Sequence, residues 1–141
     1  MPFTVIVVDD EAFDRTSVRR RLAKHPAFGE VIEIDDGDTF LDRFYRRAGG
    51  EPISATPAEP AVVLMDINMR RMSGFETLAE LQRRIDNGIG QTRLAVFMLS
   101  SSDSPRDREA AQALPIVRGY LVKPLLPDGV EQILSRLATA A

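Results

Sequence analysis

The chain has 141 residues, of which 44% are hydrophobic and 28% are charged, and its formal net charge is -3 at pH 7. This size predicts a single domain over residues 1–141, and the charge disfavours direct binding of nucleic acid. The sequence has no cysteine, which excludes a disulfide framework and a thiolate metal site. It also has no apolar run as long as a membrane span and no export signal, so we expect a cytoplasmic protein without a membrane anchor.

Five short, mostly apolar runs have the length and composition of buried strands. In chain order they are Phe3–Val8, Glu30–Ile34, Ala61–Met65, Arg93–Leu99 and Gly119–Val122. Each run is too short for a free-standing helix, and polar or turn-forming residues follow it. Longer stretches with helical periodicity separate the runs.

The first two of these stretches predict helices with one apolar face each. The first helix extends to about Lys24 and turns Val18 and Leu22 inward. The second helix is capped by Asp38 and ends at Gly49-Gly50. Its apolar face comprises Phe40, Leu41 and Phe44.

The third predicted helix, Gly74–Asp86, follows the central strand. Ser73 and Glu76 have the S-x-x-E spacing of a capping box, and Asn87-Gly88 ends the helix. Its inward residues are Leu78, Leu81 and Ile85. The segment Glu51–Pro60, which lies before the central strand, contains three prolines and is predicted to be an exposed loop.

Two further helices complete the chain. Ser104 caps the fourth, Pro105 occupies its first position, and the helix ends by Leu114 because Pro115 cannot continue it. The fifth begins near Pro127 and runs almost to the last residue. Its apolar residues follow the i, i+3, i+4, i+7 pattern and are Val130, Ile133, Leu134 and Leu137.

Five strands alternating with five helices predict an α/β fold with a parallel sheet covered on both faces. Right-handed crossovers favour a doubly wound open sheet, for which 2-1-3-4-5 is a common strand order. In such a sheet the carboxyl ends of the strands converge on one crevice, where ligands bind.

Polar residues stand at the carboxyl ends of four predicted strands. They are Asp9, Asp10, Asp66, Ser100 and Lys123. Three carboxylates in one crevice repel one another, and a divalent cation removes that repulsion. Oxygen ligands without histidine or cysteine favour a hard ion, Mg²⁺ first, while a lysine supplies charge for a phosphoryl oxygen. These groups suit phosphoryl transfer onto a carboxylate.

The motifs that carry these residues resemble those of the receiver domain of two-component response regulators. They are DD near the start, D-I-N-M-x-x-M-x-G in the middle, L-S-S, and G-Y-L-V-K-P near the end, in the family's order and over essentially the whole chain. The resemblance implies a flavodoxin-like receiver fold. It also implies a phosphorylation-activated signalling switch that receives a phosphoryl group from a sensor histidine kinase or a histidine phosphotransfer protein.

The resemblance assigns a role to each residue of the crevice. It makes Asp66 the phosphoryl acceptor. It places Mg²⁺ on the carboxylates of Asp10 and Asp66, on the backbone carbonyl of Asn68 and, largely through water, on Asp9. Lys123 would hold the phosphoryl group.

The resemblance also implies how the phosphoryl group is sensed. Ser100 would be the switch hydroxyl, Ser101 would offer its backbone N–H, and Tyr120 would be the switch aromatic residue. The Lys123-Pro124 bond would be cis. From the places of Ser100 and Tyr120 and the small side chains of the fourth helix, we predict that partner binding or self-association uses the fourth helix, the fifth strand and the fifth helix.

The sequence departs from the family pattern at Arg70, which stands where a proline usually follows the acceptor by four residues. Either the loop is looser there, or Arg70 reaches the site. The loop before the central strand is also longer than usual, and one extra residue separates Ser100 from Lys123.

We weigh two other functions. An Mg²⁺-dependent phosphohydrolase with an aspartyl nucleophile needs a general acid two residues after the nucleophile, where this chain has Asn68, and a cap domain. A flavodoxin-like nucleotide-binding module needs a glycine-rich phosphate loop where this chain has acids.

We therefore favour the phosphorylation-activated signalling switch over these two alternatives, and this function predicts further properties of the molecule. We expect no output domain and no enzymatic activity except on the chain's own phosphoryl group. We expect a monomer or a weak, phosphorylation-dependent dimer. It would act through a downstream protein partner or as a sink for phosphoryl groups.

Overall fold

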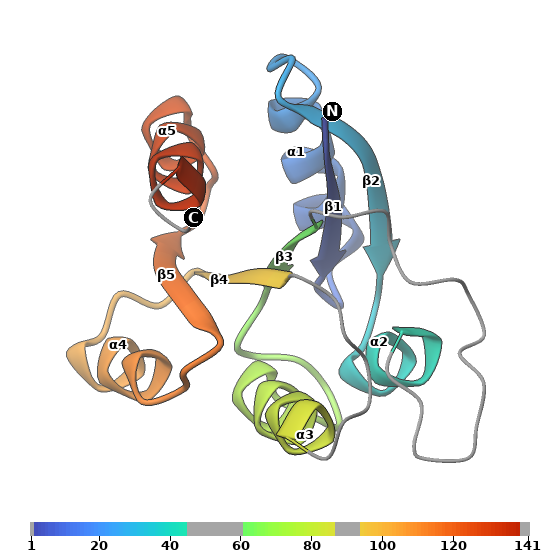
Figure 1. Cartoon of the computed structure of the whole chain (residues 1–141), viewed down its shortest axis with the longest axis vertical. Coiled ribbons are helices and arrows are strands. Elements are labelled where there is room, and N and C mark those ends of the chain that lie inside the picture. Colours follow the sequence, from blue (N-terminus) through green and yellow to red (C-terminus); the bar gives the residue numbers. More distant parts are fainter. Residues whose placement is uncertain (1, 45–60, 87–93, 139–141) are drawn as a thin grey trace.

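The computed structural model describes residues 2–44, 61–86 and 94–138, and shows a five-stranded parallel sheet between two layers of helices (Figure 1). The strands are β1 (Phe3–Val8), β2 (Phe28–Ile34), β3 (Ala61–Met65), β4 (Leu94–Ser100) and β5 (Val117–Val122). Their order is β2-β1-β3-β4-β5, and all neighbouring pairs are parallel. The predicted fold class and strand order are confirmed.

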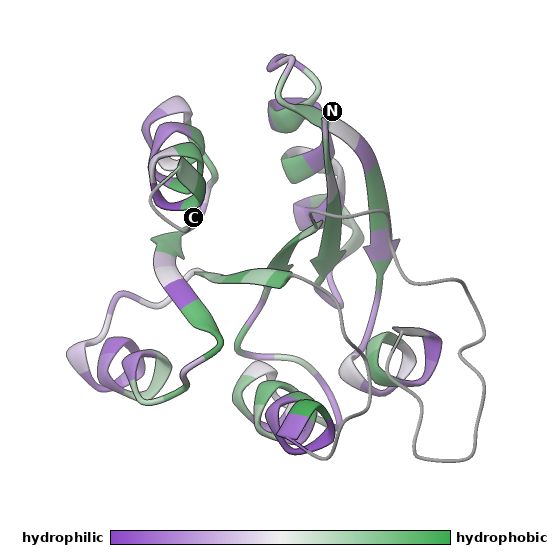
Figure 2. Cartoon of the chain, in the orientation of Figure 1, coloured by the Kyte–Doolittle hydropathy of each residue, from purple (hydrophilic) through white to green (hydrophobic). Residues whose placement is uncertain are grey.

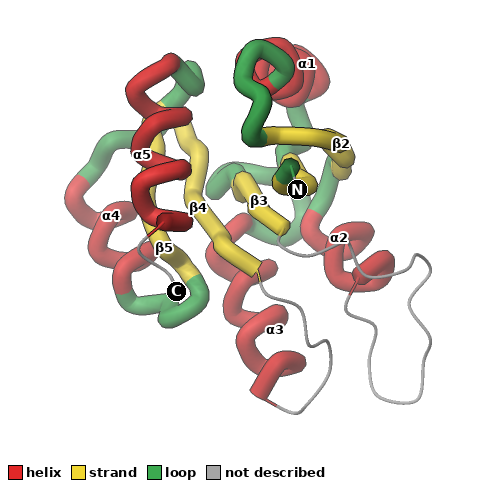
Figure 3. Tube along the Cα trace, turned by 45° about the horizontal axis from the view of Figure 1, so that its top comes forward, coloured by secondary structure: helices red, strands yellow, loops and turns green. Residues whose placement is uncertain are grey.

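The five helices are α1 (Ala12–Leu22), α2 (Gly37–Phe44), α3 (Gly74–Asp86), α4 (Pro105–Gln112) and α5 (Pro127–Ala138). Helices α1 and α5 cover one face of the sheet, while α2, α3 and α4 cover the other (Figures 1 and 3). This division follows from the right-handed crossovers, which reverse direction on the two sides of β1.

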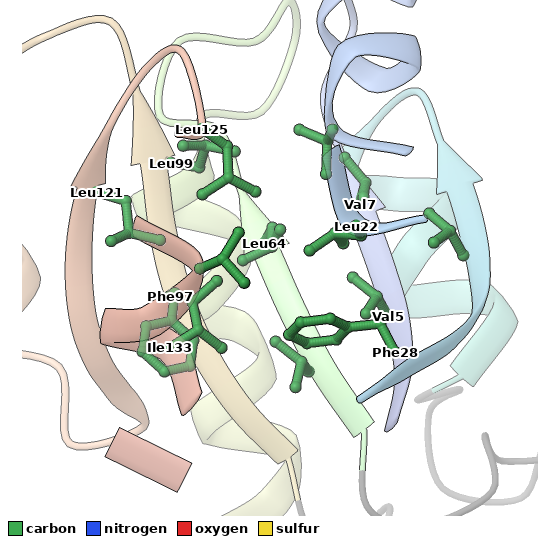
Figure 4. Close-up of a cluster of buried hydrophobic side chains, with 14 of the residues drawn as sticks. Val5, Val7, Leu22, Phe28, Leu64, Phe97, Leu99, Leu121, Leu125 and Ile133 are labelled. Carbon is green, nitrogen blue, oxygen red and sulfur yellow. The ribbon is translucent and has the colours of Figure 1, made fainter. Parts of the chain in front are cut away.

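The sheet is apolar on both faces, and each face forms its own core. The strand residues alternate between the two cores, so that Ile6 and Val8 belong to the core under α2, α3 and α4, while Val5 and Val7 belong to the core under α1 and α5. Figure 4 shows the second core, in which Leu22 from α1 and Ile133 from α5 reach the strands. Figure 2 shows the consequence for hydropathy, because the central strands are hydrophobic along their length while the helices carry polar residues on the outside.

Most predicted boundaries are confirmed. The bounds of β1, β3 and α3 match the predicted ranges, and β2 and β5 begin two residues earlier than predicted. The capping box at the start of α3 is formed, because the Ser73 N–H donates to Glu76 Oε1 at 2.9 Å and the Glu76 N–H donates to Ser73 Oγ at 3.1 Å. Ser104 caps α4 by accepting from the Asp107 N–H at 3.1 Å.

One predicted cap is wrong. Asp36, not Asp38, caps α2, because its Oδ1 accepts from the Thr39 N–H at 2.7 Å. The helix begins at Gly37, so Asp38 lies inside the first turn and its carboxylate instead pairs with the Arg71 guanidinium. Two consecutive aspartates precede Gly37 in the sequence, and only the backbone path decides which of the three acids reaches the free N–H groups.

Some predictions fall outside the described residues. They are the end of the second helix at Gly49-Gly50, the loop Glu51–Pro60 and the stop at Asn87-Gly88, together with the inward side chain of Phe44. Among the helices in the described part of the chain, none is long and apolar enough to cross a membrane.

Candidate functional site

Three aspartates meet at the carboxyl edge of the sheet, where β1 and β3 lie side by side. Asp9 and Asp10 follow β1, and Asp66 follows β3. Main-chain bonds fix their positions, because the Asp9 N–H donates to the Ile34 carbonyl and the Asp66 N–H donates to the Val8 carbonyl, both at 3.0 Å. One carboxylate oxygen from each aspartate lies within 4.8 Å of the others. The predicted convergence of the three acids is therefore found.

Lys123, at the end of β5, neutralises part of this cluster. Its Nζ lies 2.7 Å from Asp9 Oδ2, 2.8 Å from Asp14 Oδ2 and 3.5 Å from Asp66 Oδ1. Burial by itself lowers the pKa of Lys123, but the hydrogen bonds that its ammonium donates to Asp14 and Asp9 outweigh burial and raise the pKa above its usual range. The ammonium group therefore stays charged. The bond from Lys123 to Pro124 is cis, as the family resemblance implies.

Asp66 is a buried acid with a raised pKa. Only 6% of the residue is exposed. Burial, followed by the charge of Asp9, raises its pKa to about 6, while Lys123 opposes the shift. At neutral pH the carboxylate is mostly ionised, which leaves it able to act as a nucleophile.

The loop after Asp66 closes over Asp10. The Arg70 N–H donates to Asp10 Oδ2 at 3.0 Å, and Arg70 Nε lies 3.5 Å from the same oxygen. A proline at this position would lack the N–H, so the departure from the family pattern brings Arg70 to the site. The end of this loop, Gly74, packs against the backbone of Asp66, where the loop begins. A Cβ atom at position 74 would lie 2.0 Å from the Asp66 carbonyl oxygen, so only glycine fits there. Asn68 is exposed at the edge of this loop.

The hydroxyl residues lie on the β4 side of the site. Ser100 is fully buried, and its Oγ accepts from the Ser102 N–H at 3.1 Å. The Tyr120 hydroxyl donates to the Ser102 carbonyl at 2.7 Å, with the ring buried and the Arg108 guanidinium 4.8 Å from its centre. Ser101 is exposed and lines the same cavity as the acids.

Sequence reasoning missed two residues of the site. Asp14 pairs with Lys123 although it belongs to α1, and its signal was its place one helical turn after Asp10. Ser102 contacts both Ser100 and Tyr120 through its main chain, and no side-chain pattern announces such a role.

The donor set fits a hard divalent cation. The three aspartates offer oxygen ligands only, and two of them, Asp10 and Asp66, line a cavity of about 490 Å³ with Asn68 and Lys123. Asp10 is the best exposed of the three. Burial raises the pKa of Asp66 most and the charge of Asp9 adds to it, and an ion beside Asp10 would offset that charge.

Comparison with known proteins agrees with this geometry. The nitrate/nitrite response regulator proteins NarP and NarL of Escherichia coli K12 are 33% identical over 127 residues and 27% identical over 138 residues. These alignments cover 90% and 97% of this chain, but 51% and 55% of NarP and NarL, so the chain spans about half the length of these relatives. A solved two-component response regulator from Legionella pneumophila is 25% identical with a TM-score of 0.73, over 97% of this chain and 98% of that one.

A family model described as the response regulator receiver domain matches residues 5–135, nearly the whole chain. The fold, the strand order and the acidic cluster agree with that match. The chain belongs to the response regulator receiver domain family.

Proposed function

We propose that Asp66 accepts a phosphoryl group from a phosphohistidine of a partner sensor kinase or histidine phosphotransfer protein, and that the chain works as a switch in a two-component system. The observation that carries this proposal is the position of the Asp66 carboxylate. It lines an open cavity, has a raised pKa, and lies 3.5 Å from the Lys123 ammonium. This is the arrangement needed to attack a phosphorus atom and to neutralise the charge that develops on its oxygens.

The reaction needs no general base, because the nucleophile is a carboxylate. An Asp66 oxygen forms the new O–P bond while the P–N bond of the phosphohistidine breaks, and the electron pair of that bond returns to the imidazole nitrogen. Lys123 is already charged and sits beside the acceptor, so it can hold a phosphoryl oxygen. The Ser101 N–H and the Ser100 hydroxyl would donate to the remaining oxygens.

A magnesium ion would be held by the carboxylates of Asp10 and Asp66, by the backbone carbonyl of Asn68 and, largely through water, by Asp9. When bound, it would supply charge neutralisation for the transferred group. Asp10 is the ligand whose removal isolates this effect, because it is not the acceptor and the ion pairs of Lys123 within the described residues are with Asp9, Asp14 and Asp66.

The switch would be read on the β4–α4 side of the site. Ser100 and Tyr120 share Ser102 as a hydrogen-bond partner, so a Ser100 hydroxyl that turned toward a phosphoryl group would release the Ser102 N–H. Tyr120 and the first turn of α4 would then rearrange together, since Ser102 Oγ also bonds Asp107 Oδ2 at 2.6 Å. We propose that α4, β5 and α5 form the partner surface and that the chemistry is confined to the chain's own phosphoryl group.

The test is labelling with acetyl phosphate in the presence of Mg²⁺, followed by intact-mass measurement and mapping of the modified residue. Wild type should gain one phosphoryl group on Asp66, and Asp66→Asn should gain none. The control is Asp128→Asn, which removes an exposed acid from the start of α5 and should label like wild type. Equal labelling of Asp66→Asn and wild type would refute the acceptor assignment.

A second arm tests the metal. Chelator should prevent labelling, and Asp10→Asn should weaken Mg²⁺ binding, measured by calorimetry, by at least about tenfold because it removes one charged ligand. Labelling that is indifferent to chelator would refute a role for the ion.

A further inference from the structure

Lys123 is held by carboxylates that are not the acceptor. Its ammonium group has three N–H donors, and two are engaged at hydrogen-bond distance, by Asp9 at 2.7 Å and by Asp14 at 2.8 Å. The distance to Asp66 Oδ1 is 3.5 Å, longer than either hydrogen bond. In the unphosphorylated protein, Lys123 is thus bound more closely to its neighbours than to the residue it is expected to assist.

Asp9 and Asp14 differ in how they reach Lys123. Asp9 is part of the acid cluster itself and is only 3% exposed, whereas Asp14 approaches from α1 and its side chain is 33% exposed. The position of Asp14 is nevertheless fixed, because the next residue anchors the helix. Arg15 Nη1 donates to the Asp9 carbonyl at 2.7 Å, and Arg15 Nε donates to Glu33 Oε1 at 3.2 Å.

The two states of the site place different demands on Lys123. Without a phosphoryl group, the pairing with Asp14 offsets the cost of burying the ammonium. A phosphoryl group on Asp66 adds negative charge and three acceptor oxygens, which compete with Asp14 for the same donors. Only one of the three N–H donors is not engaged by Asp9 or Asp14, so Lys123 must weaken or share its contact with Asp14 to hold the phosphoryl group with more than one hydrogen bond.

We propose that Asp14 is a positioning residue that holds Lys123 away from Asp66 in the unphosphorylated protein and thereby weakens binding of the phosphoryl group. This inference rests on the proposed function, because it takes Asp66 as the acceptor and Lys123 as its partner. Asp14 then sets the balance between the resting and phosphorylated states without touching the transferred group.

The test measures the affinity for beryllofluoride, a mimic of the phosphoryl group, at saturating Mg²⁺. Asp14→Asn keeps the shape of the side chain and removes its charge, so it should bind beryllofluoride about fivefold more tightly than wild type, a modest gain because Asp14 is partly exposed. Asp14→Glu restores the charge and should bind with an affinity close to that of wild type.

The matched control separates positioning from general charge. Glu11→Gln removes an acid that lines the cavity beside Asp66. In the described part of the chain, the ion-pair partners of Lys123 are Asp9, Asp14 and Asp66 rather than Glu11. The affinity of Glu11→Gln should stay within about twofold of wild type. In a Lys123→Ala background, Asp14→Asn should have no effect, since there is no ammonium left to release.

Each outcome decides the proposal. An affinity of Asp14→Asn that equals or falls below that of wild type, in a variant with native circular dichroism, would overturn it. So would an equal gain in Glu11→Gln, or a gain that persists without Lys123. If wild type itself bound no beryllofluoride, the proposed function would fail together with this inference, whereas the other results leave the proposed function standing.

Discussion

Helices α1 and α4 flank the site on opposite faces of the sheet, and they are attached to it very differently. Helix α1 buries Val18 and Leu22, and three of its arginines donate to main-chain carbonyls outside the helix, the first being Arg15 to Asp9. Arg19 Nη2 donates to the Val31 carbonyl at 2.8 Å, and Arg21 Nε donates to the Leu125 carbonyl at 3.0 Å. Helix α4 buries only Ala111.

The attachment of α4 to the site depends on a short chain of polar contacts. Ser102 joins Ser100, Tyr120 and Asp107, and the Arg108 side chain lies over the Tyr120 ring. Few buried apolar contacts and several exchangeable hydrogen bonds are the marks of an element that can shift at low cost. The difference teaches that α1 is fixed to the sheet by buried side chains and arginine hydrogen bonds, while α4 is held mainly by polar contacts, as the proposed switch requires.

The largest effect that we expect is a structural response to beryllofluoride on the α4 side of the site, and its location tests the comparison between α1 and α4. Beryllofluoride should change amide hydrogen exchange over residues 100–114 and around Tyr120, because Ser102 links those segments to Ser100. Ser100→Ala should abolish that response while labelling of Asp66 persists, since the acceptor is unchanged. Changes confined to α1 and α2 would show that the switch runs through the anchored side.

A smaller effect concerns the acid cluster that α1 supports. Because the pKa of Asp66 is raised from 3.8 to about 6, the folded protein without metal holds a proton at pH 5 that the unfolded chain has released. Stability contributed by this group is therefore lost as pH rises from about 4 to 6, by about 2 kcal/mol in all.

This pH effect can be isolated with Asp66→Asn, which removes the titrating group. In denaturant unfolding with chelator present, the unfolding free energy of the variant relative to that of wild type should rise by about 2 kcal/mol from pH 4 to pH 7. A difference between the two proteins that is the same at both pH values would contradict the assigned shift.

The smallest expected effect concerns the anchor of α1. Glu33 accepts hydrogen bonds from Arg15 at 3.2 Å and from Arg19 at 2.8 Å. The hydrogen bond from Arg19 has the largest effect on the pKa of Glu33, and together the two arginines keep that pKa below its usual value. Glu33→Gln should therefore cost about 1 kcal/mol of unfolding free energy at pH 7. The control Glu131→Gln, whose exposed carboxylate lies 3.7 Å from His25, should cost close to nothing. Equal costs would remove the case for a specially anchored α1.

The sequence alone determined the elements and the edge at which the site forms. The capping box at Ser73 was predictable, since both of its partners lie within one helical turn. These features depend on local periodicity and local hydrogen bonds.

Only the tertiary structure decided which side chains meet across long stretches of chain. The pairing of Asp14 with Lys123 joins residues 109 positions apart, and the pairing of Tyr120 with the Ser102 carbonyl uses a main-chain group that every residue has. The choice of Asp36 over Asp38 as a cap likewise followed from the backbone path. A sequence pattern specifies which face of an element a residue occupies, but the partner of a charged or polar group is chosen by distance and burial, which exist only after the sheet and its helices have packed.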